Sequence, residues 1–133
     1  MSEKLYSIVC IEDEDEIREA IADMLQDEGY SVTQASNGRE GLDVILRTKP
    51  DLIICDIYMP HMDGFTVCRE FRARMADNPY IPFLFLSALP QDAEKLKKQK
   101  VRIDGYLTKP IDFDLLLAQI RQLTGSADTA APE

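Results

Sequence analysis

The sequence is poor in the residues that cross-link small domains or bind transition metals. It contains 3 cysteines, 1 histidine and no tryptophan among 133 residues. Cys10, Cys55 and Cys68 form no CxxC pair, and His61 completes no ligand spacing with them, so a zinc site is not expected. Because the cysteines are odd in number and two of them sit in apolar runs, we expect buried thiols in a reducing compartment.

The chain also lacks an excess of positive charge and a long apolar run. Lys and Arg together number 15 against 24 Asp and Glu, which gives a net charge of -9. An acidic surface disfavours binding of nucleic acid by this segment. We recognise neither a signal peptide nor an apolar membrane span, so we expect a cytoplasmic protein without membrane contact. A chain of this length can bury the core of one domain without disulfides.

Acidic residues are abundant, and five of them follow one another directly after an apolar run, in "IVCIEDEDEIREA". Adjacent carboxylates repel each other unless a bound cation or another positive group offsets them. Glu14, Asp15 and Glu16 are expected to open a helix, where negative charge interacts favourably with the helix dipole. Glu12 and Asp13 directly follow the apolar run and are candidates for holding a cation.

Five apolar runs alternate with segments of helical periodicity, which predicts an α/β fold with a mainly parallel sheet. The strands are predicted near 6–11, 30–34, 51–56, 81–87 and 103–108. Helices are predicted between and after them: one closed by Gly29, one capped by Ser36 or Asn37 and stopped by Lys49 and Pro50, one over 65–75, a short exposed one over 91–100, and a last one closed by Gly125. The half-polar second strand suits a sheet edge.

Polar side chains collect where these strands end. The ends carry Glu12 and Asp13, then Asp56, Ser87 and Lys109. Ligands of open parallel sheets bind beyond the carboxyl ends of the strands, so these groups are expected to converge. Each one alone has an ordinary explanation as a helix cap or a solvated loop residue. Together, the carboxylates could bind Mg²⁺, and the ammonium and the hydroxyl could hold phosphoryl oxygens. One carboxylate could then act as the nucleophile, so the set predicts phosphoryl transfer onto an Asp.

Four motifs give the chain a family resemblance: "ED", "CDIYMPHMDG", "LSA" and "YLTKP", each following a predicted strand. In this order and spacing the sequence resembles, over about residues 5–123, the receiver domain of two-component response regulators, of the CheY-like superfamily. The resemblance implies a five-stranded parallel sheet in the flavodoxin-like order 2-1-3-4-5, with helices on both faces. It also implies a receiver domain over 1–125 and a flexible tail or linker over 126–133.

The resemblance assigns a chemical role to each strand-end residue. Asp56 looks like the phosphoacceptor, and Lys109 would contact the phosphoryl group. Mg²⁺, or Mn²⁺ in its place, would be held by Asp13, Asp56, Glu12 and the backbone carbonyl of Tyr58. Asp is more usual where this chain has Glu12, whose longer side chain would reach the metal directly or through water.

Further residues would transmit and time the signal. Ser87 would sense the phosphoryl group and Tyr106 would change rotamer on activation. The bond between Lys109 and Pro110 is commonly cis in the family. Tyr58 and Leu89 lie two residues beyond the acceptor and the switch hydroxyl, where the family tunes the lifetime of the phosphoryl group. Because both are bulky, we expect slow loss of phosphate.

The function implied is that of a regulatory phosphoacceptor and not of a turnover enzyme. A histidine kinase or a histidine phosphotransfer protein would be the donor. The face formed by the fourth helix, fifth strand and fifth helix would switch, and a homodimer partner or an output domain would bind there. The chain would be a stand-alone receiver or part of a longer protein.

Two other functions stay open at this point. A phosphatase of the haloacid dehalogenase type also uses an Asp at a strand end with Mg²⁺, but it requires a second Asp two residues later, where this chain has Tyr58. A pseudo-receiver would bind partners without phosphate. Its usual sign is loss of the acceptor, the acid pair or the lysine, and Asp56, Glu12, Asp13 and Lys109 are all present.

Overall fold

A computed structural model describes residues 5–76, 80–89, 91–98 and 103–126. The predicted tail therefore lies, from residue 127 onward, outside the described residues. Five parallel strands form one sheet in the order β2-β1-β3-β4-β5. The strands are β1 Ser7–Ile11, β2 Ser31–Ala35, β3 Leu52–Asp56, β4 Phe83–Ser87 and β5 Gly105–Thr108. The helices are α1 Asp15–Asp27, α2 Gly38–Thr48, α3 Gly64–Arg74, α4 Asp92–Lys98 and α5 Phe113–Thr124.

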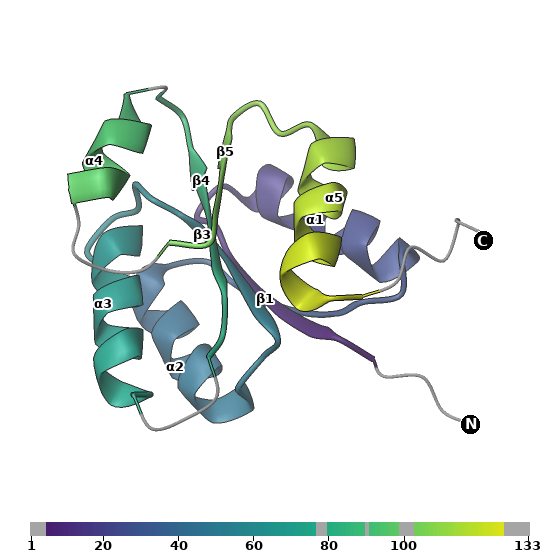
Figure 1. The fold of residues 1–133 in the computed structure, drawn as a ribbon, viewed down its shortest axis with the longest axis horizontal. Helices are drawn as coiled ribbons and strands as arrows, with labels where there is room; N and C mark the ends of the chain where they lie inside the picture. The colour runs from purple at the N-terminus through teal and green to yellow at the C-terminus, as the bar shows by residue number, and fades with distance from the viewer. Residues whose placement is uncertain (1–4, 77–79, 90, 99–102, 127–133) are drawn as a thin grey trace.

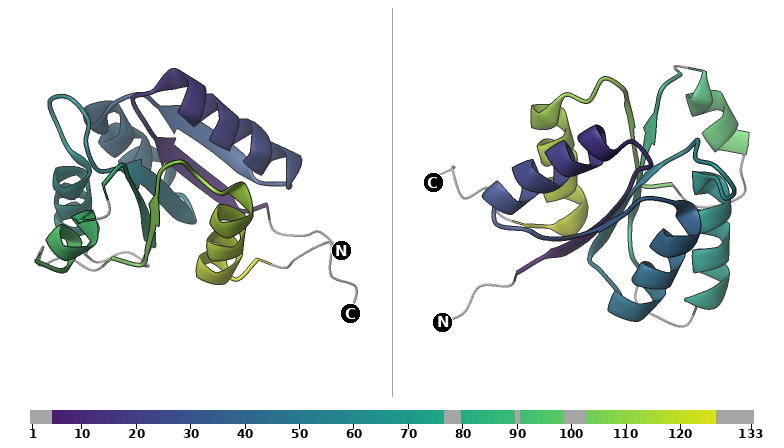
Figure 2. Two further views of the ribbon diagram at one scale, coloured as in Figure 1. Left: turned by 90° about the horizontal axis from the view of Figure 1, so that it is seen from above. Right: turned by 180° about the vertical axis from the view of Figure 1, so that it is seen from behind.

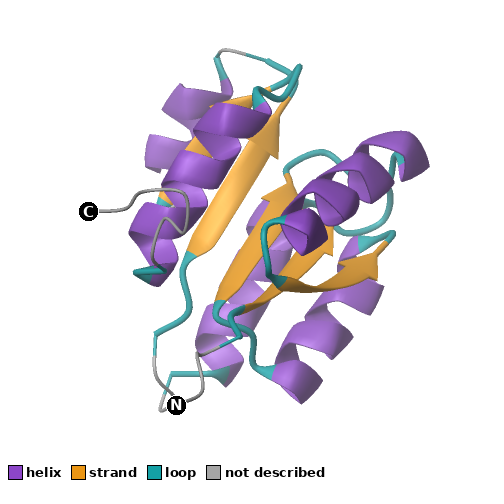
Figure 3. Ribbon diagram, turned by 90° about the vertical axis from the view of Figure 1, so that its right-hand side faces the viewer, coloured by secondary structure: helices purple, strands orange, loops and turns teal. Residues whose placement is uncertain are grey.

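The fold is the predicted α/β architecture, with the sheet between two helical layers (Figure 1). α1 and α5 cover one face, and α2 and α3 cover the other, as the views in Figure 2 also show. The strands lie in the middle and are drawn in orange in Figure 3. Both the fold class and the strand order predicted from the sequence are confirmed.

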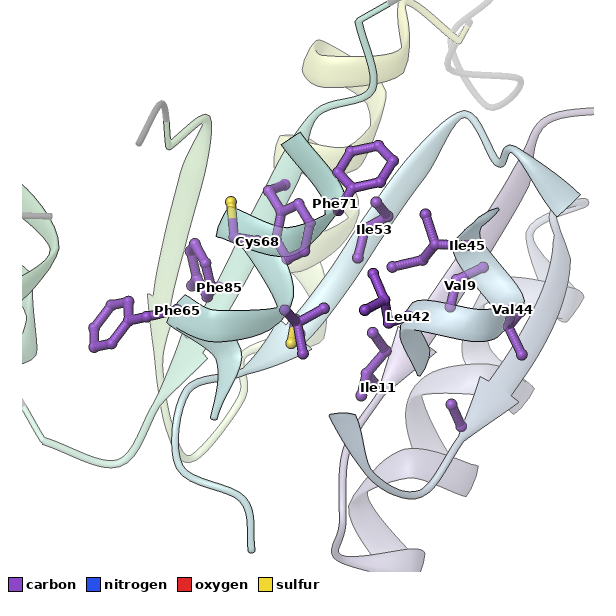
Figure 4. Close-up of a cluster of buried hydrophobic side chains, with 14 of the residues drawn as sticks. Val9, Ile11, Leu42, Val44, Ile45, Ile53, Phe65, Cys68, Phe71 and Phe85 are labelled. Atoms are coloured by element: carbon purple, nitrogen blue, oxygen red, sulfur yellow. The ribbon is translucent and has the colours of Figure 1, made fainter. Parts of the chain in front are cut away.

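Alternating side chains of the strands supply two separate cores. In β1, Val9 packs in the cluster under α2 and α3, whereas Ile8 packs in the cluster under α1 and α5. Figure 4 shows part of the first cluster, with Phe71 of α3 and Ile45 of α2 facing the sheet. Every residue of β3 and β4 is buried, as expected of strands covered on both faces.

The predicted strand ends agree with the structure within two residues, and β2 is an edge strand as predicted. Asn37, and not Ser36, is the N-cap of α2, since its side chain accepts a hydrogen bond from the Glu40 backbone N–H. Glu40 accepts in return from the Ser36 backbone N–H at 2.7 Å. Lys49 follows α2 in the left-handed conformation, so the helix ends where the sequence predicted.

The predicted exposed helix α4 is present, with one exception to its exposure. The segment was expected to be exposed, and most of its described side chains are, but Asp92 at the start of the helix is fully buried. The reason is a tertiary contact: its carboxylate accepts hydrogen bonds from Ser87, at the end of β4, and from Tyr58, which follows β3.

Gly64 begins α3 directly behind the site, and its lack of a side chain matters for packing. A Cβ atom at this position would collide with the backbone carbonyl of Asp56 and would lie 3.1 Å from the Ile57 Cα. The Gly64 N–H donates to the Ile57 carbonyl at 2.7 Å, which holds the start of α3 against the end of β3.

We therefore expect Gly64→Ala to lower the free energy of unfolding by about 1–3 kcal/mol, because backbone must move to make room. Helix propensity alone predicts the opposite sign, a gain of up to about 1 kcal/mol. Urea unfolding of both chains measures the difference. An unchanged or increased stability would contradict the close approach of α3 to Asp56.

Candidate functional site

Three carboxylates meet at the carboxyl ends of β1 and β3, which lie side by side in the sheet. One oxygen each from Glu12, Asp13 and Asp56 lies within 4.8 Å of the others. β1 and β3 pair in parallel with Ile11 beside Cys55, so the residues after Ile11 and after Cys55 reach the same edge. Parallel pairing thus brings together residues more than forty positions apart, as the sequence predicted.

Glu12 is held in place by hydrogen bonds to its backbone and to its side chain. Its side chain is fully buried, its backbone N–H donates to the Ala35 carbonyl, and Oε2 accepts from the Glu14 N–H at 3.0 Å. Arg18 donates to its backbone carbonyl at 2.9 Å. Burial raises the pKa of Glu12, and the neighbouring Lys109 ammonium opposes that rise. Glu12 is therefore fixed in place, and nearby positive charge favours its ionised form against the effect of burial.

Lys109 supplies positive charge from the end of β5. Its Nζ lies 2.8 Å from Glu12 Oε1, 3.3 Å from Glu14 Oε1 and 3.5 Å from Asp56 Oδ1. Burial lowers the pKa of Lys109, but the neighbouring carboxylates of Glu12 and Asp56 outweigh it, so the pKa is raised overall. Lys109 is therefore a fixed cation beside the carboxylate that the sequence singled out.

Glu14 opens α1 as predicted, but its carboxylate also reaches the site. Glu14 is the N-cap residue of α1, but its side chain makes no capping hydrogen bond. Its carboxylate contacts Lys109 instead, so this acid belongs to the rim of the site. Asp15 and Glu16 occupy the first turn of α1, as predicted. The spacing alone could not separate these roles, since all three acids follow one another at the same helix start.

Asp56 is buried, with only 4 % of its surface exposed. Burial, followed by the negative charge of Glu12, raises the pKa of Asp56 from 3.8 to about 7, against the opposing effect of Lys109. A carboxylate in this position is poised between its neutral and ionised forms near neutral pH. A bound cation would favour the ionised, nucleophilic form.

The donor set fits a hard divalent cation such as Mg²⁺. It consists of carboxylate oxygens from Glu12, Asp13 and Asp56, with Asp13 the most accessible of the three to solvent. Glu12 Oε1 is buried and accepts no hydrogen bond of good geometry within the described residues, although Lys109 lies close to it. An additional positive charge at this edge would satisfy that oxygen. The Tyr58 carbonyl as a further ligand stays a prediction.

Ser87, at the end of β4, is turned toward α4. Its hydroxyl has two acceptors within reach, Asp92 Oδ2 and the Leu89 carbonyl at 3.0 Å, and its Oγ accepts from the Leu89 N–H at 3.1 Å. Among the described residues, the structure does not pair this hydroxyl with Lys109 or Asp56. Tyr58, after β3, reaches the same acid: its hydroxyl donates to Asp92 Oδ1 at 2.7 Å. Sequence reasoning missed Asp92, because "QDAEKLKKQK" shows only the charge pattern of a solvated helix.

Tyr106 of β5 lies against the β4–α4 turn. Its hydroxyl donates to the Leu89 carbonyl at 3.1 Å, and its ring packs partly buried beside the core under α3. Leu89 itself is 40 % exposed. The peptide bond between Lys109 and Pro110 is cis. Ser87 and Tyr106, which the sequence predicts to be the switch pair, thus both form hydrogen bonds with the backbone of Leu89.

The thiols lie outside this cluster of charges. Cys10, Cys55 and Cys68 are all buried and free, as predicted. Burial raises the pKa of Cys10 to about 12, so its thiol stays protonated. His61 is exposed in the β3–α3 loop. None of the described helices has the length and apolar character to span a membrane.

Comparison with known proteins identifies the family to which the chain belongs. Residues 8–121 match the family described as the response regulator receiver domain. The chain belongs to this family. Receiver domains of response regulators are regulatory, and they bind Mg²⁺ at an acidic cluster. The matched range contains the other four strands and all of β1 except its first residue, and it ends within α5.

Individual relatives agree. The chain is 39 % identical over 123 residues to the DNA-binding dual master transcriptional regulator RpaA of Synechocystis, covering 91 % of this chain and 50 % of RpaA. It is 37 % identical over 116 residues to the response regulator MprA of Mycolicibacterium vanbaalenii, covering 87 % of this chain and 49 % of MprA. The receiver thus spans about half the length of the curated relatives it matches.

Solved structures are similar as well. The chemotaxis response regulator CheY4 of Vibrio cholerae superposes with a TM-score of 0.82 at 29 % identity, covering 90 % of this chain and 99 % of CheY4. The response regulator TrrA of Thermotoga maritima, solved in complex with Mg²⁺ and BeF, gives a TM-score of 0.79 at 32 % identity, covering 90 % of this chain and 99 % of TrrA.

Proposed function

We propose that this receiver accepts a phosphoryl group on Asp56 in a reaction that requires Mg²⁺, and that the phosphorylated form changes the surface of α4, β5 and α5. The observation that carries the proposal is the joint position of a buried carboxylate, two further acids and Lys109 at one sheet edge. In the transfer step, one carboxylate oxygen of Asp56 forms a bond to phosphorus. The bond between phosphorus and the donor breaks at the same time, and the donor leaves with its electron pair.

Each residue would contribute a definite part. Glu12, Asp13 and Asp56 would hold the metal, which offsets the charge of the incoming phosphoryl oxygens. Lys109 would pair with one of those oxygens, since an ammonium binds phosphate as a point charge. The phosphoryl group adds roughly two negative charges, which favours conformations that place the hydroxyl of Ser87 near it.

The donor would be a histidine kinase or a histidine phosphotransfer protein, and the site of action the cytoplasm. The α4, β5 and α5 surface would carry the output, through an attached domain or a homodimer partner. Residues 1–125 would form the receiver unit. Tyr58 and Leu89, which are each about 40 % exposed at the site's rim, would limit access of water and lengthen the life of the phosphoryl group.

Incubation with acetyl phosphate tests the proposed function directly. With Mg²⁺ the chain is expected to gain one phosphoryl group, seen by intact-mass spectrometry, and with a chelator in place of Mg²⁺ it is expected to gain none. Steady hydrolysis of p-nitrophenyl phosphate would instead support the aspartate-nucleophile phosphatase. Absence of labelling at any metal concentration would support a pseudo-receiver.

The pH dependence of Mg²⁺ binding follows from the pKa of Asp56, which is about 7 in the folded chain. Because this pKa is raised, ionisation of Asp56 opposes folding of the metal-free chain, and the cost grows between about pH 4 and pH 7. Mg²⁺ requires the ionised form, so its affinity is expected to fall about tenfold between pH 8 and pH 6.

Mg²⁺ titration followed by amide chemical shifts measures that change. Asp56→Asn is the matched control, because an amide at this position does not titrate and most of the pH dependence should disappear. Equal affinity at both pH values in the unaltered chain would contradict the raised pKa.

A further inference from the structure

Asp92 is an unexpected buried acid next to the site. It is fully buried at the first turn of α4, and its carboxylate accepts hydrogen bonds from the hydroxyl groups of two residues outside α4. Ser87 at the end of β4 donates to Oδ2, and Tyr58 in the β3–α3 loop donates to Oδ1 at 2.7 Å. The acid therefore links the predicted switch residue Ser87 to Tyr58, which the sequence analysis connects with the lifetime of the phosphoryl group.

Lys95 offsets the negative charge of Asp92 only weakly. Lys95, one turn further along α4, has its Nζ 3.9 Å from Asp92 Oδ1 and donates to the Tyr58 hydroxyl at 2.8 Å. Lys95 also lies over the Tyr58 ring at 5.3 Å. Because Lys95 is largely exposed, its charge is screened by solvent. Hydroxyl donors are thus the main partners of a buried carboxylate, and hydrogen bonds of this kind to a charged group are strong.

We propose that Asp92 is a positioning residue that holds the Ser87 hydroxyl toward α4 and competes with the phosphoryl group for it. The inference rests on the proposed function, since it concerns phosphorylation at Asp56. Ser87 has one hydroxyl proton, so it cannot donate to Asp92 and to a phosphoryl oxygen at the same time. Activation requires that the hydrogen bond to Asp92 break.

The Tyr58 hydroxyl sets how strongly Asp92 holds Ser87. Both hydroxyls share the charge of one carboxylate, so each weakens the hold on the other. Release of Ser87 would leave Asp92 with Tyr58 and Lys95 as partners, which keeps the buried charge partly compensated. The same contacts connect Tyr58 to α4, so release of Ser87 would also change the hydrogen bonding of Tyr58.

Beryllofluoride, a stable mimic of the phosphoryl group, tests the proposal in the presence of Mg²⁺. Asp92→Asn keeps the shape but removes the charge that holds Ser87, so we expect half-saturation at about tenfold lower beryllofluoride concentration, as for loss of one charged hydrogen bond. Glu94→Gln is the matched control: it removes an exposed acid from the same helix and should change nothing.

Tyr58→Phe provides a second test with the opposite sign. It removes the competing hydroxyl and retains the ring, so Ser87 becomes the sole hydroxyl donor to Asp92. The hold on Ser87 should strengthen, and half-saturation should shift several-fold to higher beryllofluoride concentration. This variant keeps the proposal testable if Asp92→Asn does not fold.

Ser87→Ala completes the set as a double-mutant cycle. In its background, Asp92→Asn and Tyr58→Phe should no longer change the beryllofluoride affinity, because the group they act through is gone. Unchanged affinity in the Asp92 variant, a weaker affinity, or effects that persist without Ser87 would each overturn the proposal. Failure of the unaltered chain to bind beryllofluoride would instead overturn the proposed function and this inference with it.

Discussion

Asp56→Asn is expected to abolish phosphorylation by acetyl phosphate with Mg²⁺. The amide retains the shape of the side chain but is not a nucleophile at phosphorus, and it supplies no negative charge to a cation. Intact-mass spectrometry after a fixed incubation measures the labelled fraction, which should fall to the background of a reaction without metal. This is the largest effect that the geometry of the site predicts.

The folded structure of this variant should survive. Asp56 is buried with a pKa of about 7, so a neutral group at this place is tolerated at neutral pH. The matched control is Asp43→Asn, an exposed acid of α2, which should be labelled like the unaltered chain. Normal labelling of Asp56→Asn would show that another residue accepts the phosphoryl group.

Lys109→Met is expected to slow phosphorylation of the chain while strengthening its binding of Mg²⁺. The methionine keeps an unbranched stem but removes the ammonium that lies 3.5 Å from Asp56 Oδ1. Loss of a preorganised charge at a reacting group typically slows a reaction about a hundredfold, so the rate of labelling should fall by about that factor. Removing a cation from a cluster of carboxylates should at the same time tighten Mg²⁺ binding about fivefold.

The two opposite changes distinguish loss of a functional group from loss of structure. An unfolded or distorted chain would lose both Mg²⁺ affinity and labelling. Lys97→Met, on the exposed side of α4, is the control and should change neither. Labelling at the normal rate in Lys109→Met would contradict the role of this side chain in phosphoryl transfer.

Most of the architecture could be predicted because it follows from patterns that the chain repeats. The apolar run from Leu52 to Cys55 has no polar residue to face solvent, so it had to be a strand covered on both sides. Acids and a lysine at the ends of such strands then had to share one edge of a parallel sheet. These two rules predict the positions of Asp56 and Lys109 without any family resemblance.

The contacts of Glu14 and Asp92 that the sequence did not predict have a common physical cause. Glu14 and Asp92 both sit at a helix start, where a helix pattern predicts only that an acid is favourable. Which way each side chain turns is decided by residues distant in sequence: Lys109, 95 positions away, attracts Glu14, and Tyr58, 34 positions away, donates to Asp92. Tertiary contacts of this kind leave no mark on the local pattern.

The central claim is that the phosphoryl group resides on Asp56, and chemical trapping tests it most directly. Borohydride reduces an aspartyl phosphate to homoserine, which peptide mass spectrometry places at one position in the sequence. After treatment with acetyl phosphate and Mg²⁺, we predict homoserine at position 56 and at no other Asp. Homoserine at a different acid, or a phosphoryl group that resists reduction and maps to Ser, Thr or His61, would contradict the account.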